Sequence, residues 1–196
     1  MRGLRAAGFT VACALALGAC GGGERQDADE PEGDYRLEVV DARFPAEQSI
    51  AERSTMRIRV RNADSKTVPN VAVTVETAPK TPGGASGSFS QNRDDESLAD
   101  PSRPVWIVDR GPEGGETAYT NTWALGPLRA GQTKTFEWRV TPVVAGRYTV
   151  RYQVSPGLDG KAELAGGEGG GEFKVTVDDE PADARIADDG KTVVRE

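Results

Sequence analysis

Histidine is missing from this chain of 196 residues, and the sequence holds only two cysteines, Cys13 and Cys20. The absence of histidine excludes histidine-ligated metal sites, Ser-His-Asp and Cys-His nucleophile systems, and the commonest general base. No zinc-ligand spacing, haem-attachment motif or glycine-rich phosphate loop is present either. We therefore expect a protein that is not an enzyme and that carries no metal or other cofactor.

The sequence also lacks an apolar run long enough to cross a bilayer, which needs about 20 residues. Its N-terminus instead has the charged start and short uncharged stretch of a secretory signal, with Arg2 and Arg5 before residues 6–17. The stretch ends in the motif LGAC at 17–20, which resembles the lipobox of bacterial lipoprotein precursors.

That resemblance implies that residues 1–19 are a lipoprotein signal peptide and that Cys20 becomes the lipidated N-terminus. Lipid on Cys20 would hold the protein at the extracytoplasmic side of the cell membrane, because two or more acyl chains anchor a protein stably. An ordinary signal peptide that happens to precede a cysteine is the alternative. In both cases the exported chain has one cysteine, which excludes an intramolecular disulfide.

Residues 20–34 follow the expected cleavage point and contain no large apolar side chain. Chain of this glycine-rich, acidic composition cannot bury enough surface to fold, so we expect a flexible tether. The exported chain is acidic: without Arg2 and Arg5 it has 22 cationic and 31 anionic side chains, a net charge of −9. This charge argues against nucleic-acid binding, which depends on cationic contacts to phosphates.

Residues 35–177 have the length of one domain, and their apolar residues mostly recur at every second position. Such alternation predicts strands with one buried and one wetted face. Eight segments show it or a short apolar run: 37–44, 56–60, 71–75, 104–108, 117–125, 136–140, 148–154 and 173–177. The sequence thus predicts an all-β protein, an immunoglobulin-like antiparallel β-sandwich of about 7–8 strands.

Finer features of these segments predict local structure. The apolar parity changes after Val39, so we expect a β-bulge near Val40. The outward-facing Arg57, Arg59 and Arg61 form a basic stripe, which we interpret as a solvated face crossed by acidic residues of a neighbouring strand.

The stretch from Leu128 to Val154 has a glycine turn, a strand with alternating aromatic residues, a turn with proline and glycine, and then Gly-x-Tyr-x-Val. It is similar to the tail of bacterial immunoglobulin-like domains of the CARDB and DUF11 type. The resemblance covers about 27 residues and implies an adhesion or spacer module on a bacterial surface. It implies no catalytic residues, because these domains share none. Tyr148 in this stretch suggests a tyrosine corner, with its hydroxyl bonded to nearby backbone.

The long segment 78–103 has almost no strand signal and is rich in glycine, serine and proline. Loops of this length are usually functional or disordered. One hypothesis is a binding loop that uses Phe89, the acidic Asp94 and Asp95, and the nearby Trp106. The alternative, which we favour from the composition, is an insertion with Phe89 packed back onto the sandwich.

Three tryptophans, Trp106, Trp123 and Trp138, could form a platform on which a sugar stacks. A sandwich of this size more often places such residues in its core, and Trp138 shares the inward parity of Phe136. We therefore interpret them as core residues.

Residues 178–196 form an acidic tail in which Asp189-Gly190 lies between two short apolar segments. Asp-Gly is a strong hairpin signal, so a small hairpin or loose chain is expected there. The acidic clusters at 94–100 and 178–180 could suggest calcium, but neither has the spacing of a calcium-binding loop. Solvated charge is the simpler interpretation.

Three functions remain open from the sequence. The first is an envelope-tethered binding module that contacts another envelope protein, a glycan or a peptide through the long loop or a free strand edge. The second is an accessory domain or a carboxylate-based hydrolase, which requires two carboxyl groups about 5–10 Å apart in a cleft. The third is a passive structural spacer. Oligomeric state is not predicted by any pattern in the sequence.

Overall fold

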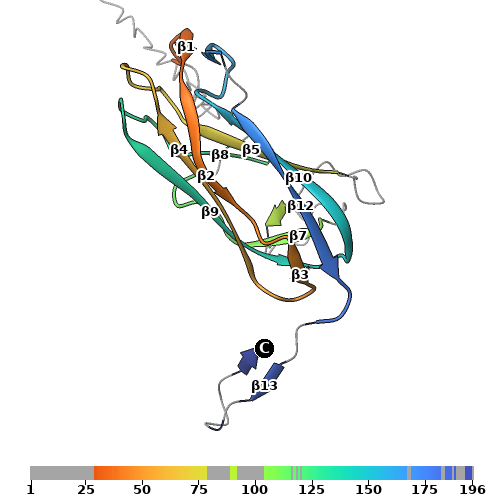
Figure 1. Ribbon diagram of the computed structural model, residues 1–196. Coiled ribbons are helices and arrows are strands. Elements are labelled where there is room, and N and C mark those ends of the chain that lie inside the picture. The colour runs from red at the N-terminus through yellow and green to blue at the C-terminus, as the bar shows by residue number, and fades with distance from the viewer. Residues whose placement is uncertain are drawn as a thin grey trace, which may run out of the picture.

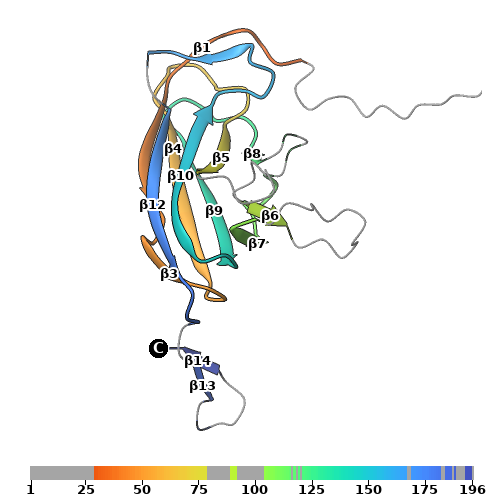
Figure 2. The same cartoon turned by 90° about the vertical axis from the view of Figure 1, so that its right-hand side faces the viewer.

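The structure is a computed structural model, and it describes residues 29–78, 89–91, 104–115, 117, 119, 121–166, 169–181, 184–186, 188 and 193–195. Two five-stranded sheets pack face to face (Figures 1 and 2). The first sheet has the order β2-β4-β9-β7-β6 and the second β3-β12-β10-β5-β8. Strands β1 and β11 form a separate pair, as do β13 and β14.

The strands have these bounds. The first sheet is built from β2 (Leu37–Arg43), β4 (Ser54–Asn62), β9 (Thr133–Pro142), β7 (Trp106–Arg110) and β6 (Phe89–Gln91). The second is built from β3 (Glu47–Ser49), β12 (Gly170–Asp178), β10 (Gly146–Ser155), β5 (Ala72–Ala78) and β8 (Thr122–Ala124). The two pairs are β1 (Gly33–Tyr35) with β11 (Ala162–Leu164), and β13 (Ala184–Ile186) with β14 (Val193–Arg195).

The all-β sandwich predicted by the alternation is confirmed. Each of the eight predicted segments overlaps a strand, and β4 alternates between buried and exposed residues along its full length. The two sheets hold ten strands where about 7–8 were predicted, because the three-residue strands β3 and β6 are too short to show alternation. Its inward residues Met56, Ile58 and Val60 are fully buried between the sheets. Burial of such alternating side chains drives the folding of both sheets, at about 1.5–3 kcal/mol for each large apolar side chain.

Three finer predictions also agree with the structure. The pairing of β2 with β4 shifts register between Val39 and Asp41, which is the predicted bulge at Val40. The Tyr148 hydroxyl donates a hydrogen bond to the backbone oxygen of Ala145 at 3.1 Å, as in a tyrosine corner. On the basic stripe, Arg61 pairs with Glu38 of β2 and the Arg57 Nε lies 3.9 Å from Glu137 of β9.

The prediction of a strandless segment over 78–103 needs a correction. Strand β6 lies within it and pairs in parallel with β7, with Phe89 opposite Trp106. The Phe89 ring packs against Trp106, Trp123 and Trp138 at centroid distances of 6.2, 6.0 and 6.4 Å. The ladder with β7 and the buried ring of Phe89 hold this short strand in the sheet, although the sequence around it is polar.

The prediction of a flexible tether up to residue 34 also needs a correction. Residues 29–34 are described, and β1 begins at Gly33 within the predicted tether. The strand pairs in parallel with β11, and Tyr35 at its end is buried. Glycine and acidic residues therefore form ordered chain here because the body of the domain supplies their hydrogen-bond partners.

The two ends of the chain leave the sandwich at opposite ends. Strand β1 lies at one end, while β3 and the pair β13–β14 lie at the other (Figure 1). Strand β13 pairs antiparallel with β14, which is the hairpin arrangement that the Asp-Gly dipeptide suggests. Among the described residues, no helix has the length and apolarity needed to cross a membrane.

Candidate functional site

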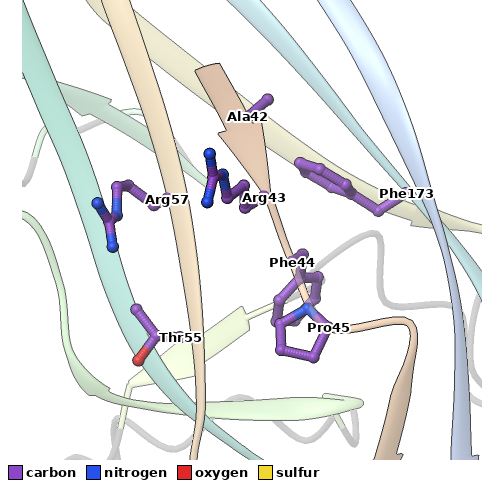
Figure 3. Close-up of a pocket in the computed structure, with 7 residues that line it drawn as sticks. All are labelled: Ala42, Arg43, Phe44, Pro45, Thr55, Arg57 and Phe173. Carbon is purple, nitrogen blue, oxygen red and sulfur yellow. The ribbon is translucent and has the colours of Figure 1, made fainter.

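A groove opens on the sandwich where β2 leaves its neighbour β4. Its volume is about 560 Å³, and its lining is more apolar than that of a second hollow described below. Figure 3 shows the residues that line it, which come from β2, β4, β12 and the chain between β2 and β3: Ala42, Arg43, Phe44, Pro45, Thr55, Arg57 and Phe173.

The groove exists because the chain crosses from one sheet to the other at this point. The last residue of β2, Arg43, pairs with Arg57 of β4. The chain then passes through Phe44 and Pro45 to β3, which pairs in parallel with β12 of the second sheet. Pro45 suits the end of an edge strand because it cannot donate a ladder hydrogen bond.

The crossing also leaves a short length of β4 without a neighbour on one side. Residues 54–56 of β4 pair with β9, while the β2 ladder stops at Arg57. Backbone groups on an open edge of this kind can pair with an added strand. Within the described residues, no strand fills this position.

The floor of the groove is the ring of Phe44, which is held from below. Phe44 is 8% exposed and packs on Trp106 with ring centroids 5.6 Å apart. Trp106 donates from Nε1 to Oε1 of Gln48 at 2.9 Å, and Gln48 Nε2 donates to the Pro45 carbonyl oxygen at 2.9 Å. These bonds satisfy the polar atoms of a buried side chain and fix the crossing that carries the floor.

The back of the groove is Phe173 on β12. Its ring meets Phe44 edge-on at 6.0 Å and lies 5.4 Å from the ring of Tyr152 on β10. Tyr152 can take this position because Gly171 has no side chain: a Cβ there would lie 2.5 Å from the tyrosine hydroxyl oxygen. The glycine-rich stretch before Phe173 is thus partly strand, and one of its glycines makes room for the aromatic wall.

The rim carries two guanidinium groups on the outer face. The Arg43 side chain is 77% exposed and pairs with Asp41 of its own strand at 2.9 Å. The Arg57 side chain is 48% exposed, and its Nε lies 3.9 Å from a Glu137 oxygen. Exposed pairs of this kind contribute little stability, about 0–1 kcal/mol. The two guanidinium groups can therefore reorient toward a ligand carboxylate at little cost.

A second hollow of about 920 Å³ lies on the outer face of the other sheet, over β5, β10 and β12. Two carboxylates, Glu76 and Glu172, line it, and both stand opposite Arg151 across neighbouring strands. Glu172 and Arg151 have side chains 50% and 61% exposed and lie 3.8 Å apart. A general acid needs a carboxyl group whose pKa is raised by burial, whereas this arrangement is a solvated cross-strand ion pair.

Two of the four residues predicted for a binding loop, Phe89 and Trp106, lie in the core, as the favoured alternative had it for Phe89. Phe89 is 6% exposed and Trp106 is fully buried, so neither ring is available to a ligand at the surface. This corrects the binding-loop hypothesis for these two residues, because the core of the sandwich takes both rings. Trp123 and Trp138 are buried with them, as interpreted.

The other predicted site residues are not placed together. Asp94 and Asp95 lie outside the described residues, as does Cys20. The acidic residues 178–180 follow the end of β12, and no group of three potential metal ligands occurs in the part of the chain that the structure describes.

Sequence reasoning missed the groove because its lining comes from three separate segments. The only signals were local: the parity change at Val40 and the proline directly after Phe44. They indicate that an edge strand bends and ends, but not which residue of a distant strand stands opposite.

No family model matches this chain, and no curated protein matches it. Several solved structures are similar. A CARDB domain from Pyrococcus furiosus, crystallised with di-metal ions, is 16% identical with a TM-score of 0.44, over 75% of this chain and 91% of that one.

The Escherichia coli alpha-2-macroglobulin, from domain MG7 to the C-terminus, is 12% identical with a TM-score of 0.43. That match covers 80% of this chain but 21% of the other. A human complex of zinc 2-glycoprotein with prolactin-inducible protein is 10% identical with a TM-score of 0.39, over 74% of this chain and 97% of the matched one. None of these likenesses bears on what this chain binds.

Proposed function

We propose that this protein is a lipid-anchored binding module of the cell envelope, and that its groove takes an extended segment of a partner protein. The observation that carries the proposal is the combination of the apolar floor at Phe44 and the apolar back at Phe173 with the open edge of β4 beside them. The partner segment would add to that edge through its backbone. One of its apolar side chains would enter the groove.

The positive charge on the rim of the groove indicates which residues the partner segment contains. Arg43 and Arg57 stand on the rim of the groove, and Arg57 directly follows the open edge at 54–56. A carboxylate in the partner segment would compete with Asp41 and Glu137 for these guanidinium groups, which bind carboxylates well because of their planar donor geometry. The proposed ligand is thus an extended peptide with an apolar residue next to an acidic one.

A peptide suits this surface better than a glycan does. Sugar recognition commonly uses an exposed aromatic face, and all three tryptophans are buried here. At the groove, Phe44 is 8% exposed and Phe173 is partly buried, and their rings meet edge-on, so they offer no flat platform. The proposal is of binding and not of catalysis, since the groove lining contains no carboxylate.

The test is selection from a library of random linear peptides displayed on phage, with the full chain immobilised. We expect peptides with adjacent apolar and acidic residues. These peptides should bind two variants at least about tenfold more weakly than they bind the parent chain. Phe173→Ala removes the back of the groove, and Arg57→Glu reverses a charge on its rim. Arg147→Glu is the matched control, because it reverses an exposed charge on β10 of the other sheet, outside the groove.

Two results would count against the proposal. Selected peptides that bind Arg57→Glu and Phe173→Ala as well as the parent chain would place the site elsewhere. A selection that enriches no peptide would favour the passive spacer.

The lipid anchor rests on the LGAC motif and is tested separately. The full chain and its Cys20→Ala variant are expressed in a bacterial host and partitioned between detergent and water. We expect the parent chain in the detergent phase with acyl mass on its N-terminal peptide, and the variant without it. A parent chain without acyl mass would make the protein a freely secreted sandwich.

A further inference from the structure

The carboxylate of Glu30 is enclosed by the loop between β10 and β11. Its Oε2 accepts hydrogen bonds from the backbone N–H groups of Leu158 at 2.5 Å and Asp159 at 3.0 Å. Its Oε1 accepts from those of Lys161 at 3.1 Å and Ala162 at 3.0 Å. Four converging backbone donors form a concave anion site of the kind called a nest.

The loop is shaped for this carboxylate. Gly157 precedes the four donors, and a Cβ on it would lie 2.2 Å from the Glu30 Oε1 atom and 2.3 Å from the Cδ atom. Partial burial raises the pKa of Glu30, and the four backbone hydrogen bonds lower it. The hydrogen bonds have the larger combined effect, so the pKa lies below its ordinary value of 4.5. The group is therefore ionised in the nest at neutral pH.

The chain after Glu30 is fixed at two more places. Residues 33–35 pair in parallel with 162–164 of β11. Tyr35 is 5% exposed, and Lys66 Nζ lies 4.3 Å from the centroid of its ring. The segment from Glu30 to Tyr35 is thus an extended strap with a charged contact at one end and a buried ring at the other.

We propose that the loop 157–162 is a carboxylate-binding site that fixes the N-terminal chain, and that it holds the β1–β11 end of the sandwich next to the membrane. This inference rests on the proposed function, because it takes the lipid to be on Cys20. The groove would then lie away from the membrane, because Phe44 and Pro45 in its lining lead into β3. Strand β3 lies at the end of the sandwich opposite β1 (Figure 1).

Chain length supports this geometry. Ten residue steps separate Cys20 from Glu30, and even fully extended chain covers at most about 35 Å over that distance. Without the strap the first fixed residue would be Leu37 in β2. The extended chain from Cys20 to Leu37 covers at most about 60 Å. The contact at Glu30 therefore restricts how far the domain can tumble over the lipid surface.

The nest itself is tested in the full chain by hydrogen exchange of the four donor amides, those of Leu158, Asp159, Lys161 and Ala162. Glu30→Ala removes the acceptor, and we expect at least about tenfold faster exchange at these four amides. Glu32→Ala is the matched control, because it removes an exposed carboxylate two residues away. Gly157→Ala is a second variant that should displace the carboxylate by steric contact and speed up the same amides. Equal exchange in parent and Glu30→Ala chains would overturn the proposal.

The orientation is tested with the lipidated protein in vesicles that contain acceptor-labelled phospholipid. A single donor dye is placed at Ala130→Cys, beside the start of β9, or at Ala145→Cys, beyond its end; these sites are about 33 Å apart along the strand. We expect stronger energy transfer from position 130 than from position 145, and a smaller difference when Glu30→Ala is added.

The outcomes separate the two proposals. Equal transfer from both positions on a lipidated chain would overturn the orientation while the lipid anchor stands. A chain without acyl mass would overturn the anchor and the orientation together, and the exchange at 158–162 would still decide whether Glu30 fixes the N-terminal chain.

Discussion

The indole nitrogen of Trp106 lies 2.9 Å from Oε1 of Gln48, and both side chains are buried. This bond joins β7 of the first sheet to β3 of the second, 58 residues apart in the chain. It is also the support of the groove, because the same Gln48 donates to the carbonyl oxygen of Pro45.

Replacement of Gln48 by leucine is expected to lower the free energy of unfolding by about 1–3 kcal/mol, because it leaves the Trp106 N–H buried without an acceptor. Urea denaturation followed by tryptophan fluorescence measures the change. Glu47→Leu, at the exposed neighbouring position, should change stability by much less. An unchanged midpoint in the Gln48 variant would show that the indole finds another acceptor.

Phe89→Ala is expected to destabilise the domain by about 3–5 kcal/mol, as for a buried aromatic residue whose loss leaves a cavity. The reason is that Phe89 touches three tryptophan rings of the core. Thermal unfolding followed by near-ultraviolet circular dichroism measures it. Val143→Ala, at a side chain 44% exposed, is the control. A stable Phe89→Ala protein would restore the binding-loop hypothesis.

Tyr148→Phe is expected to cost about 0.5–1.5 kcal/mol at neutral pH, because it removes the hydrogen bond to the Ala145 carbonyl. Chemical denaturation of the two proteins at neutral pH measures this difference.

The same variant gives a prediction for alkaline pH. Burial raises the pKa of Tyr148 above its ordinary value of 10.0, so the folded protein favours the neutral phenol. Its contribution to stability is complete below the ordinary pKa and is lost as pH rises through the folded pKa. The parent chain should therefore lose more stability than Tyr148→Phe above about pH 10. Parallel losses in the two proteins would contradict the assignment.

The Glu30 contact predicts the opposite dependence in acid. Its pKa is lowered in the folded protein, so its stabilising effect is present above the ordinary value of 4.5 and is lost as pH falls through the folded pKa. The parent chain should unfold at a higher temperature than Glu30→Ala at neutral pH. The two melting temperatures should converge in acid. Calorimetry at several pH values measures this, and a gap that persists in acid would mean that the charge of Glu30 is not the cause.

Local patterns were sufficient to predict the sandwich. Strict alternation such as that from Met56 to Val60 decides which face of a strand is buried, wherever the strand lies in the sheet. The bulge at Val40 and the tyrosine corner at Tyr148 are likewise local, because a parity change or a bond to residue 145 involves only nearby chain.

Features that depend on distant partners were not predictable. The sequence favoured packing of Phe89 back onto the sandwich, but its polar, glycine-rich surroundings indicate neither strand β6 nor its ring partners Trp106, Trp123 and Trp138. The acidic composition around Glu30 indicates disordered chain, yet four backbone donors more than 120 residues away bind its carboxylate.

The sequence by itself determined the alternation of the strands, the bulge, the acidic charge and the lack of histidine chemistry, since each of these is set by residue types at short spacing. Only the tertiary structure decided where β2 leaves its sheet, how Phe44 and Phe173 meet, and where the N-terminal chain is fixed. The physical reason is that these contacts join segments from different sheets, and their energies depend on distances that no local pattern specifies.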